Sequence, residues 1–537
     1  MRSGSKSIRV PIYGKRGMVA SSQPLASEAG MRILQQGGNA ADAAVAVAAA
    51  LNVTEPTSTG IGGDCFCLYW NNKEKKVNGI NGSGRAPSSL TLEFLQEQGI
   101  KDNLPPFSVH TVTVPGAAAG WVDTVEKYGT MSLKEILTPA IELAEKGFPV
   151  SPITAFFWDK GVRQLKNGPN AEELLINGRA PKEGEIMKNP TLANTFRELT
   201  EHGKAGFYEG RIAESIIELL ESLGGVMTLD DLKNHKSTFD KPISVNYRGV
   251  DIFEIPPNGQ GITALIALNI LEEFDFTDIQ HLSSEYFHLL IEIMRIAFAD
   301  TRWYVADPDV VSVPTLELLS KEYAIKRKML FNPNKATIDI QRGSPFSNSD
   351  TVYFCVVDGE GNACSFINSN YMGFGTGLIP KKCGFTLQNR GANFSLNPNH
   401  PNVLSPNKRP YHTIIPGMAV QNGELYAPFG VMGGFMQPQG HVQILVNMID
   451  YGLNPQQALD TPRFCIRDGT SKGKVALEEG IDVTVMSELA RMGHEIVPIT
   501  GWARAVFGRG QIIRRNPKTG VLCGGTDPRA DGIVIAW

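Results

Sequence analysis

The chain has 537 residues, and its 51 Lys and Arg against 55 Asp and Glu leave a formal net charge of −4. Apolar residues make up 42% and charged residues 20%, a globular composition that can bury a core without disulfides. Because there is no basic field and no run of five like charges, we expect no nucleic-acid partner. The longest apolar stretch, Ala43 to Leu51, falls far short of the roughly 20 residues of a membrane helix, so we expect no membrane partner.

Cysteine usage and the N-terminus bear on the cellular compartment. Seven cysteines are few for this length and odd in number, which favours a reducing compartment over a disulfide framework. Residues 1–16 form a basic tail with no apolar core, so they are not a secretory signal. We expect a cytoplasmic protein, with a mitochondrial transit peptide as the alternative reading of the tail.

The first third of the chain alternates helical and strand patterns. Apolar spacing after Ser21 predicts a helix that stops at Gly37-Gly38, and Asn39 can cap the next helix, whose Ala-rich body is apolar nearly all round. The glycine-rich loop 58–64 precedes a strand rather than a helix and lacks a following Gly-Lys-Ser/Thr sequence, which argues against a phosphate loop. In that strand Cys65 and Cys67 fit one apolar face better than a metal pair.

The middle of the chain is mostly helical in pattern. Residues 132–147 predict a helix with a capping serine and an interrupting Pro139, and 190–223 and 261–300 predict further amphipathic helices around a strand at 243–255. The polar stretch 335–350 predicts an exposed connection.

A β-hairpin follows that connection. Its two strands are predicted at 351–358 and 363–370, and the turn between them carries Asp358 and Asn362, to which we assign structural roles. The first residue of the hairpin is Thr351. A threonine hydroxyl is a poor nucleophile without a base, and cutting the chain before the threonine makes its own α-amine that base. This chemistry needs an exposed Asp350-Thr351 bond and a strand that fixes Thr351.

Longer blocks of sequence form two sets. The first set comprises residues 17–70, VPGAAAGW (114–121), 137–151, PPNGQG (256–261) and 298–309. The second set comprises 350–379, PNKRP (406–410), MGGF (432–435) and GGTDPRADG (524–532). In this order the two sets resemble the large-subunit and small-subunit halves of the γ-glutamyltransferase (glutathione hydrolase) family, in its lidless glutathione-hydrolase-like branch. The resemblance implies an α+β fold, the four-layer αββα sandwich of N-terminal-nucleophile hydrolases. It also implies self-cleavage between Asp350 and Thr351, giving a large-subunit part (17–350, after the tail) and a small-subunit part (351–537).

The resemblance assigns the catalytic residues position by position. Thr351 is the nucleophile that takes the acyl group as an ester, and Ser369 stands where the family has a supporting threonine. Gly433 and Gly434 match the glycine pair whose backbone N–H groups hold the oxyanion, a task that suits glycine because the backbone can approach the reacting centre closely. The position two residues after the nucleophile, a histidine in the family, is Tyr353 here.

The substrate-reading positions depart from the family. Its Asn, Gln and Asp around the glutamyl α-amino group align with Tyr371, Arg390 and Asn393, and its paired serines align with His412 and Thr413. The family's carboxylate-binding arginine aligns near Ser83, and Arg85 can replace it by a local shift. The segment 394–406 is also short, which predicts a missing lid and a more open cleft. Because Arg390 can pair with a carboxylate, acyl groups without an α-amine, such as glutaryl, are a specific alternative.

The main hypothesis is a self-processing amidohydrolase or acyltransferase that cleaves γ-glutamyl amides such as glutathione, with hydrolysis favoured over transfer. Its partners are then the acyl amide, water or an amine acceptor, and the two self-cleaved subunits with each other. An unprocessed binding scaffold is the alternative from another class. We expect no cofactor and no metal, since His281 and His288, the only histidines fairly near each other at a plausible spacing, fit helix positions better than ligand positions.

Overall fold

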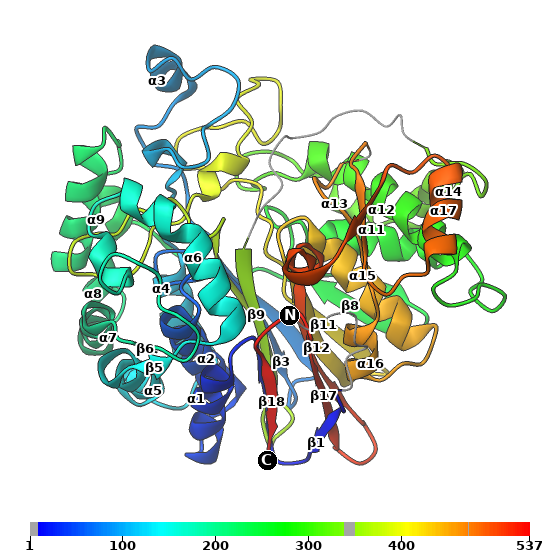
Figure 1. Ribbon diagram of the computed structural model, residues 1–537, viewed down its shortest axis with the longest axis horizontal. Helices are drawn as coiled ribbons and strands as arrows, with labels where there is room; N and C mark the ends of the chain where they lie inside the picture. The colour runs from blue at the N-terminus through cyan, green and yellow to red at the C-terminus, as the bar shows by residue number, and fades with distance from the viewer. Residues whose placement is uncertain (1–8, 338–349, 471) are drawn as a thin grey trace.

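The computed structural model describes residues 9–337, 350–470 and 472–537, and two large sheets lie at its centre (Figure 1). One sheet has the order β18-β2-β9-β10-β3-β4 and the other β1-β17-β16-β12-β11-β8-β7, each with antiparallel neighbours. β9 packs against β12 and β16, so the sheets lie face to face. The six-stranded sheet comprises β18 (Ile533–Ala536), β2 (Met18–Ser21), β9 (Asp350–Val357), β10 (Ala363–Tyr371), β3 (Asp64–Asn71) and β4 (Lys76–Gly82). The seven-stranded sheet comprises β1 (Ile12–Gly14), β17 (Leu522–Thr526), β16 (Arg509–Arg515), β12 (Glu424–Met432), β11 (Gly417–Gln421), β8 (Val250–Glu254) and β7 (Ile243–Tyr247).

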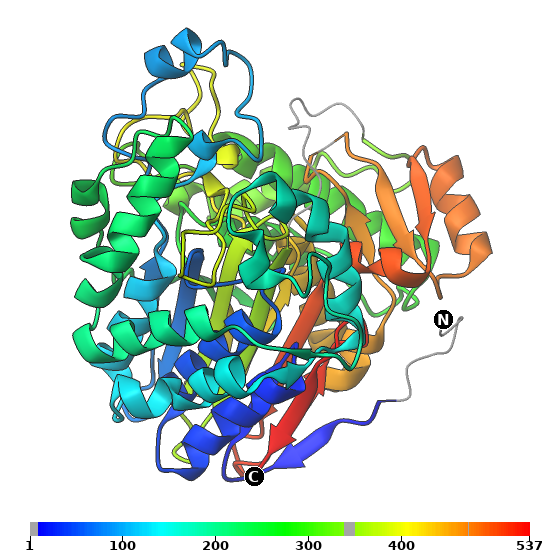
Figure 2. The same cartoon turned by 60° about the vertical axis from the view of Figure 1, so that its left-hand side comes forward.

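Helices cover the outer face of each sheet (Figures 1 and 2). The six-stranded sheet is covered by α1 (Pro24–Gln35), α2 (Ala40–Thr54) and α4 (Ala117–Tyr128), with α5 (Leu133–Lys146) packed on α2. The seven-stranded sheet is covered by α11 (Gly261–Leu271), α15 (Met436–Ile449) and α16 (Pro455–Asp460), with α12 (Ser284–Tyr304) packed on α11. Two large apolar clusters lie within these layers. The architecture is the four-layer αββα sandwich that the resemblance implied.

Shorter elements surround this sandwich. A three-stranded sheet lies outside it, with the order β13 (Phe464–Ile466), β14 (Val475–Glu478) and β15 (Ile496–Ile499), and β5 (Phe148–Pro149) pairs with β6 (Ile186–Met187). The other α-helices are α3 (Leu92–Glu97), α6 (Pro152–Asn167), α7 (Pro190–His202), α8 (Ala205–Tyr208), α9 (Arg211–Ser222), α10 (Leu229–Lys233), α13 (Thr315–Leu318), α14 (Lys321–Lys328) and α17 (Val483–Arg491). The 3₁₀ turns are η1 (Val109–Thr111), η2 (Ala171–Leu174), η3 (Arg390–Asn393) and η4 (Gly501–Phe507).

The predicted cap of the buried Ala-rich helix is confirmed. The Asn39 side chain accepts hydrogen bonds from the backbone N–H groups of Ala41 and Asp42, and the Asp42 carboxylate accepts one from the Asn39 N–H, which makes a reciprocal capping box. The Asp358 carboxylate accepts from the Ala40 N–H at 3.0 Å, so the hairpin turn also contributes to this helix start. Every residue of α2 is buried, as its apolar composition predicts.

Several predicted elements differ from the structure. Pro139 lies inside α5 without ending it. The helical stretch 190–223 is divided into α7, α8 and α9, because Gly203 and Gly210 take positive φ of 58° and 72° between them. Likewise 261–300 contains two helices, α11 and α12, rather than one.

Two further segments are more ordered than their patterns suggested. The single strand expected at 243–255 is the hairpin β7–β8, whose turn holds Arg248 and Gly249 at positive φ. The supposed basic tail contributes the edge strand β1, paired with β17. The expected connection at 335–350 lies largely outside the described residues. Within the described ranges, no helix is long and apolar enough to span a bilayer.

Candidate active site at the start of strand β9

Thr351 is the second residue of β9, and its side chain is fully buried. Its Oγ1 lies 3.1 Å from the Oγ of Ser369 on the neighbouring strand β10. The pairing of the two strands is irregular between Asn368 and Tyr371, and such a bulge re-aims side chains next to a site. We expected an exposed Asp350–Thr351 bond, and on the Thr351 side this expectation is wrong because Thr351 is buried. The backbone of Asp350 is paired with Tyr371, which draws this start of the strand into the sheet.

Arg390 joins the Thr351–Ser369 pair to the substrate-reading positions. Its Nη2 donates to the Ser369 Oγ at 3.2 Å, and its Nη1 donates to the Thr413 Oγ1 at 2.6 Å. The guanidinium is fully buried and stacks 4.6 Å from the centroid of the Tyr371 ring. Burial lowers the pKa of Arg390 to about 10, while Asp64 acts in the opposite direction. Within the described chain, Arg390 forms no ion pair within 4.0 Å, and its Nε lacks a hydrogen-bond partner.

His412 does not face the nucleophile through a hydrogen bond but pairs with Asp64. Its Nε2 lies 2.9 Å from the Asp64 Oδ2, with both side chains fully buried. The other Asp64 oxygen accepts from the backbone N–H groups of Gly84 and Gly116 and from Gln388. Burial and the charge of Arg390 lower the pKa of His412 to about 3, against the raising effect of Asp64. His412 is therefore a neutral ring at physiological pH.

The glycine pair precedes α15. Gly433 and Gly434 take positive φ of 123° and 59°, which favours glycine at both positions. The Gly433 carbonyl accepts from the Met436 N–H at 3.0 Å, so the planar peptide that carries the Gly434 N–H is held in place. The Gln260 Nε2 donates to the carbonyl of Gly434 at 2.8 Å and to that of Thr413 at 2.6 Å. Gln260 thus fixes the glycine pair relative to the substrate-reading residues.

Tyr371 and Asn393 flank Arg390. Tyr371 has a positive φ of 77°, an uncommon conformation for a non-glycine residue and one that recurs at functional sites. Burial raises the pKa of Tyr371, opposed by Arg390 and by an interaction with Asn393. Asn393 ends η3, and its Nδ2 is buried without a hydrogen-bond partner in the described structure.

Arg85 lies apart from this network. Its Nη2 forms an ion pair with the Asp309 Oδ2 at 3.0 Å, and it lines a separate surface pocket with His235. At the position where the family arginine aligns, the Ser83 hydroxyl is buried and bonded to Asn81. The structure therefore brings together every predicted site residue except Arg85, with Thr351, Ser369, Tyr371, Arg390, Asn393, His412, Thr413, Gly433 and Gly434 forming one connected region. A carboxylate-binding role for Arg85 stays a prediction.

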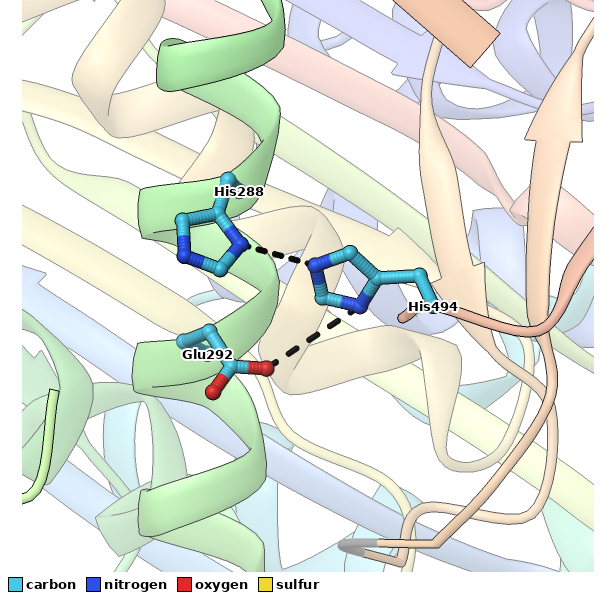
Figure 3. A group of neighbouring side chains, drawn as sticks. All are labelled: His288, Glu292 and His494. Carbon is cyan, nitrogen blue, oxygen red and sulfur yellow. Dashed lines mark hydrogen bonds and ion pairs between the residues drawn. The ribbon is translucent and has the colours of Figure 1, made fainter. Parts of the chain in front are cut away.

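A second polar cluster was not anticipated. His288 and Glu292 on α12 meet His494 from the segment before β15, and all three are buried (Figure 3). The His288 Nε2 donates to the Asn332 backbone oxygen at 2.7 Å, which leaves its Nδ1 to accept from the His494 Nε2 at 2.8 Å. Two nitrogens bound to one tetrahedral zinc ion stand roughly 3.3 Å apart, so this spacing is that of a hydrogen bond.

The surroundings of the cluster also fit a structural role. The Arg295 Nε lies 3.5 Å from the Glu292 carboxylate and supplies the positive charge there. The three ligand-type atoms nevertheless lie within 4.8 Å of one another, close enough to be considered for a metal ion. Sequence reasoning missed this cluster because His494 is distant in the chain. It also placed His281 on a helix, whereas His281 lies in the turn before α12 and bonds to Asn447.

Comparison with known proteins decides the family. The family described as Gamma-glutamyltranspeptidase matches residues 26–537. The chain belongs to this family. It is 38% identical over 530 residues to the "Glutathione hydrolase-like YwrD proenzyme" of Bacillus subtilis (strain 168), covering 98% of this chain and 99% of that protein. It is 33% identical over 547 residues to the "Glutathione hydrolase proenzyme" of the same strain, covering 97% and 92%. Members of this family are enzymes, and so is this chain.

A solved structure agrees with this assignment. The cephalosporin acylase from Bacillus halodurans superposes with a TM-score of 0.92 at 46% sequence identity, over 99% of this chain and 98% of that one. The N-terminal-nucleophile hydrolase fold of the γ-glutamyltranspeptidase family is therefore the fold of this chain.

Sequence reasoning assigned no role to Gln260 or Asp64. Both stand in quoted motifs, PPNGQG and the glycine-rich loop, and both are polar side chains within otherwise apolar or glycine-rich surroundings. That context is the signal that could have found them, because a polar side chain expected to be buried needs partners.

Proposed function

We propose that this protein is a self-processing amidohydrolase that cleaves γ-glutamyl amides such as glutathione through an ester on Thr351. The observation that carries the proposal is the position of Thr351 at the start of β9, with its hydroxyl 3.1 Å from Ser369. The relatives named glutathione hydrolase support the choice of substrate class.

Self-cleavage comes first in this proposal. The Thr351 Oγ1 attacks the carbonyl carbon of Asp350, the C–N bond of that peptide breaks, and the Thr351 nitrogen takes the hydroxyl proton. Water then hydrolyses the ester, leaving a carboxylate on Asp350 and a free α-amine on Thr351. The products are two pieces of 350 and 187 residues, which remain partners within one sandwich because β9 lies between strands β2 and β10.

Turnover uses the amine that self-cleavage releases. The free α-amine accepts the Thr351 hydroxyl proton while Oγ1 attacks the substrate carbonyl. Negative charge on the carbonyl oxygen is held by the N–H groups of the Gly433-Gly434 turn. The proton passes to the leaving amine, and water hydrolyses the ester. The positive charge of Arg390 beside Ser369 favours the charge that develops at Thr351.

We propose that hydrolysis outpaces transfer, since the short segment 394–406 supports an open cleft that water enters freely. Cytoplasmic location also remains a proposal, supported by seven cysteines that are all unpaired.

A second candidate is an acylase that prefers glutaryl-like acyl groups. The observation that favours it is the buried charge of Arg390, which has hydroxyl partners but no ion pair in the described chain. A buried charge without a counter-ion is unfavourable, and a substrate carboxylate would relieve this. The Asp64 carboxylate is already engaged by His412 and backbone groups, so an α-ammonium would find no free carboxylate in this network.

Intact mass and paired substrates test both candidates. Wild type should separate into pieces that meet at Asp350/Thr351, and Thr351→Ala should stay whole. The processed enzyme is then assayed with γ-glutamyl and glutaryl amides of the same amine. A higher kcat/KM for γ-glutamyl amides supports the first candidate, and a higher value for glutaryl amides supports the second. A folded wild-type chain that never cleaves would contradict both and favour the binding scaffold.

A further inference from the structure

A cleft of about 610 Å³ shares two of its lining residues with the candidate active site and has no role in the proposed mechanism. These two residues are Tyr371, which stacks on Arg390, and Gly433, which belongs to the glycine pair. This volume falls within the range typical of small-molecule sites, roughly 300–1,000 Å³. We call it the aromatic cleft, and its aromatic lining comprises Phe107, Phe156, Phe157, Tyr371, Phe374, Phe435 and Trp502.

The aromatic cleft meets the buried substrate-reading residues at Tyr371, which lines the cleft and stacks on Arg390. Arg390, His412 and Thr413 are fully buried, and none of them lines the cleft. A substrate carbonyl at Thr351 has two substituents, the acyl chain and the amine. If the acyl chain is read at Arg390, the amine is directed past Tyr371 and Gly433 into the aromatic cleft.

The walls of the cleft suit a planar group. The rings of Phe156 and Trp502 stack with centroids 5.2 Å apart and an interplanar angle of 16°. These residues come from α6 and η4, on opposite sides of the Asp350–Thr351 bond in sequence. Trp502 and Phe107 keep 44% and 53% of their surface exposed, an unusual amount for such large apolar side chains. An aromatic or bicyclic ligand would cover them by stacking.

The charge of the cleft selects an anion. Its charged lining residues are Lys160 and Arg467, and no Asp or Glu lines it in the described chain. The Lys160 Nζ lies 5.4 Å from the centroid of the Phe156 ring. The Arg467 Nε is buried without a hydrogen-bond partner, and the described residues give its guanidinium no ion pair. Two cations that form no ion pair with the described residues, beside stacked rings, are complementary to a carboxylate on an aromatic body.

We propose that the aromatic cleft is the leaving-amine subsite, and that it takes a planar, bulky amine carrying a carboxylate, held by Arg467 and Lys160. The inference rests on the proposed amide hydrolysis, and it concerns the amine half of the substrate rather than the acyl half. Arg467 is the stronger anchor because its Nε is buried, whereas Lys160 is exposed and its charge is screened by solvent.

Two chromogenic amides that differ by one carboxylate test the proposal. The processed enzyme is assayed with the 4-nitroanilide and the 3-carboxy-4-nitroanilide of the same acyl group, with both γ-glutamyl and glutaryl series. We expect kcat/KM to be at least about 10-fold higher for the carboxylated anilide, the scale of a charge-assisted hydrogen bond. Arg467→Gln should bring the ratio of the two kcat/KM values close to one, because only the value for the carboxylated anilide falls. Arg467→Lys should retain most of the wild-type ratio.

Controls separate the cleft from a general charge effect. Arg491→Gln removes the same charge from α17, outside the cleft lining, and should leave the ratio unchanged. Trp502→Ala should slow both anilides relative to a γ-glutamyl-glycine substrate, which lacks a ring. A ratio near one in wild type, or an unchanged ratio in a folded Arg467→Gln, would overturn the subsite alone. If the processed chain cleaves neither anilide in either series, the proposed function fails and the subsite fails with it.

Discussion

The Nη2 of Arg390 lies 3.2 Å from the Oγ of Ser369, the hydroxyl that faces Thr351. Arg390, which the alignment assigns to substrate recognition, is therefore hydrogen-bonded to Ser369, which the alignment assigns to supporting the nucleophile. The same Ser369 oxygen accepts from the Tyr371 N–H at 2.8 Å. In the proposed mechanism one hydroxyl therefore couples substrate recognition to nucleophile activation, and substitutions here should affect both.

Replacing Ser369 by Ala should slow self-cleavage and turnover. The change removes the neighbour of the Thr351 hydroxyl and leaves the donors of Tyr371 and Arg390 without this acceptor. We expect about a 10²-fold loss, the lower end of what positioned proton-transfer groups contribute. Ser369→Thr keeps the hydroxyl and should stay close to wild type. Time courses of precursor conversion by intact mass, and turnover of the processed fraction, measure the effect.

Ser365→Ala is the matched control. Ser365 lies four residues earlier on β10, and its hydroxyl bonds to Tyr353 at 2.8 Å rather than to the nucleophile. The Ser365→Ala precursor should cleave itself, and the processed enzyme should turn over, at wild-type rates. Full activity in folded Ser369→Ala would show that the hydroxyl is dispensable.

Arg390→Gln should change acyl preference. Losing a charge-assisted hydrogen bond to a substrate carboxylate costs about 1.5–3 kcal/mol, or roughly 10- to 150-fold in kcat/KM. We expect that loss for glutaryl amides and a smaller one for γ-glutamyl amides, whose α-ammonium no longer meets a like charge. Both series are measured on the processed enzyme. An equal loss of kcat/KM in the two series would mean that Arg390 supports Ser369 and does not bind the carboxylate of the acyl group.

The local pattern of the sequence was enough to predict the hairpin β9–β10 and the cap of α2. Both depend on residues within a few positions of each other, such as the Asn39–Asp42 pair. The family motifs then predicted catalytic roles for Thr351, Ser369 and the glycine pair, and the fold brings these residues into one region.

Long-range partners could not be read in this way. Gln260 bonds to Thr413 and Gly434, more than 150 positions away, and Asp64 bonds to His412 across 348 positions. No periodicity encodes such a pair. The aromatic cleft has the same origin, since α6 and η4 meet only in the folded chain.

Arg85→Gln should change kcat/KM by less than about threefold. The side chain is already paired with the exposed Asp309, and surface pairs of this kind contribute about 0–1 kcal/mol. Steady-state kinetics on the processed enzyme with γ-glutamyl and glutaryl amides check this expectation. A fall of tenfold or more would restore the predicted carboxylate role and require Arg85 to leave Asp309.

Gly433→Ala should abolish most activity. At φ 123° an added Cβ would be strained, and it would meet the Gly508 Cα at 3.2 Å, so the peptide that presents the oxyanion donors would shift. Loss of one such donor costs about 10²–10³-fold in turnover. Gly423→Ala is the control, with φ 74° and nothing near its Cβ position in the β11–β12 turn. It should lose stability but keep turnover, and equal turnover of the two variants would contradict this.

The burial of His412 predicts acid sensitivity of the fold. Its pKa falls from 6.5 to about 3 on folding, chiefly through burial, so below pH 6.5 the unfolded chain binds a proton that the folded chain does not. The free energy of unfolding should therefore fall as the pH drops from 6.5 towards 3, by up to about 1.4 kcal/mol per pH unit from this residue. His412→Gln can still donate to Asp64 but does not titrate. Its melting temperature should fall less steeply than that of wild type between pH 6.5 and 5, and parallel slopes would show that His412 is protonated in the folded state.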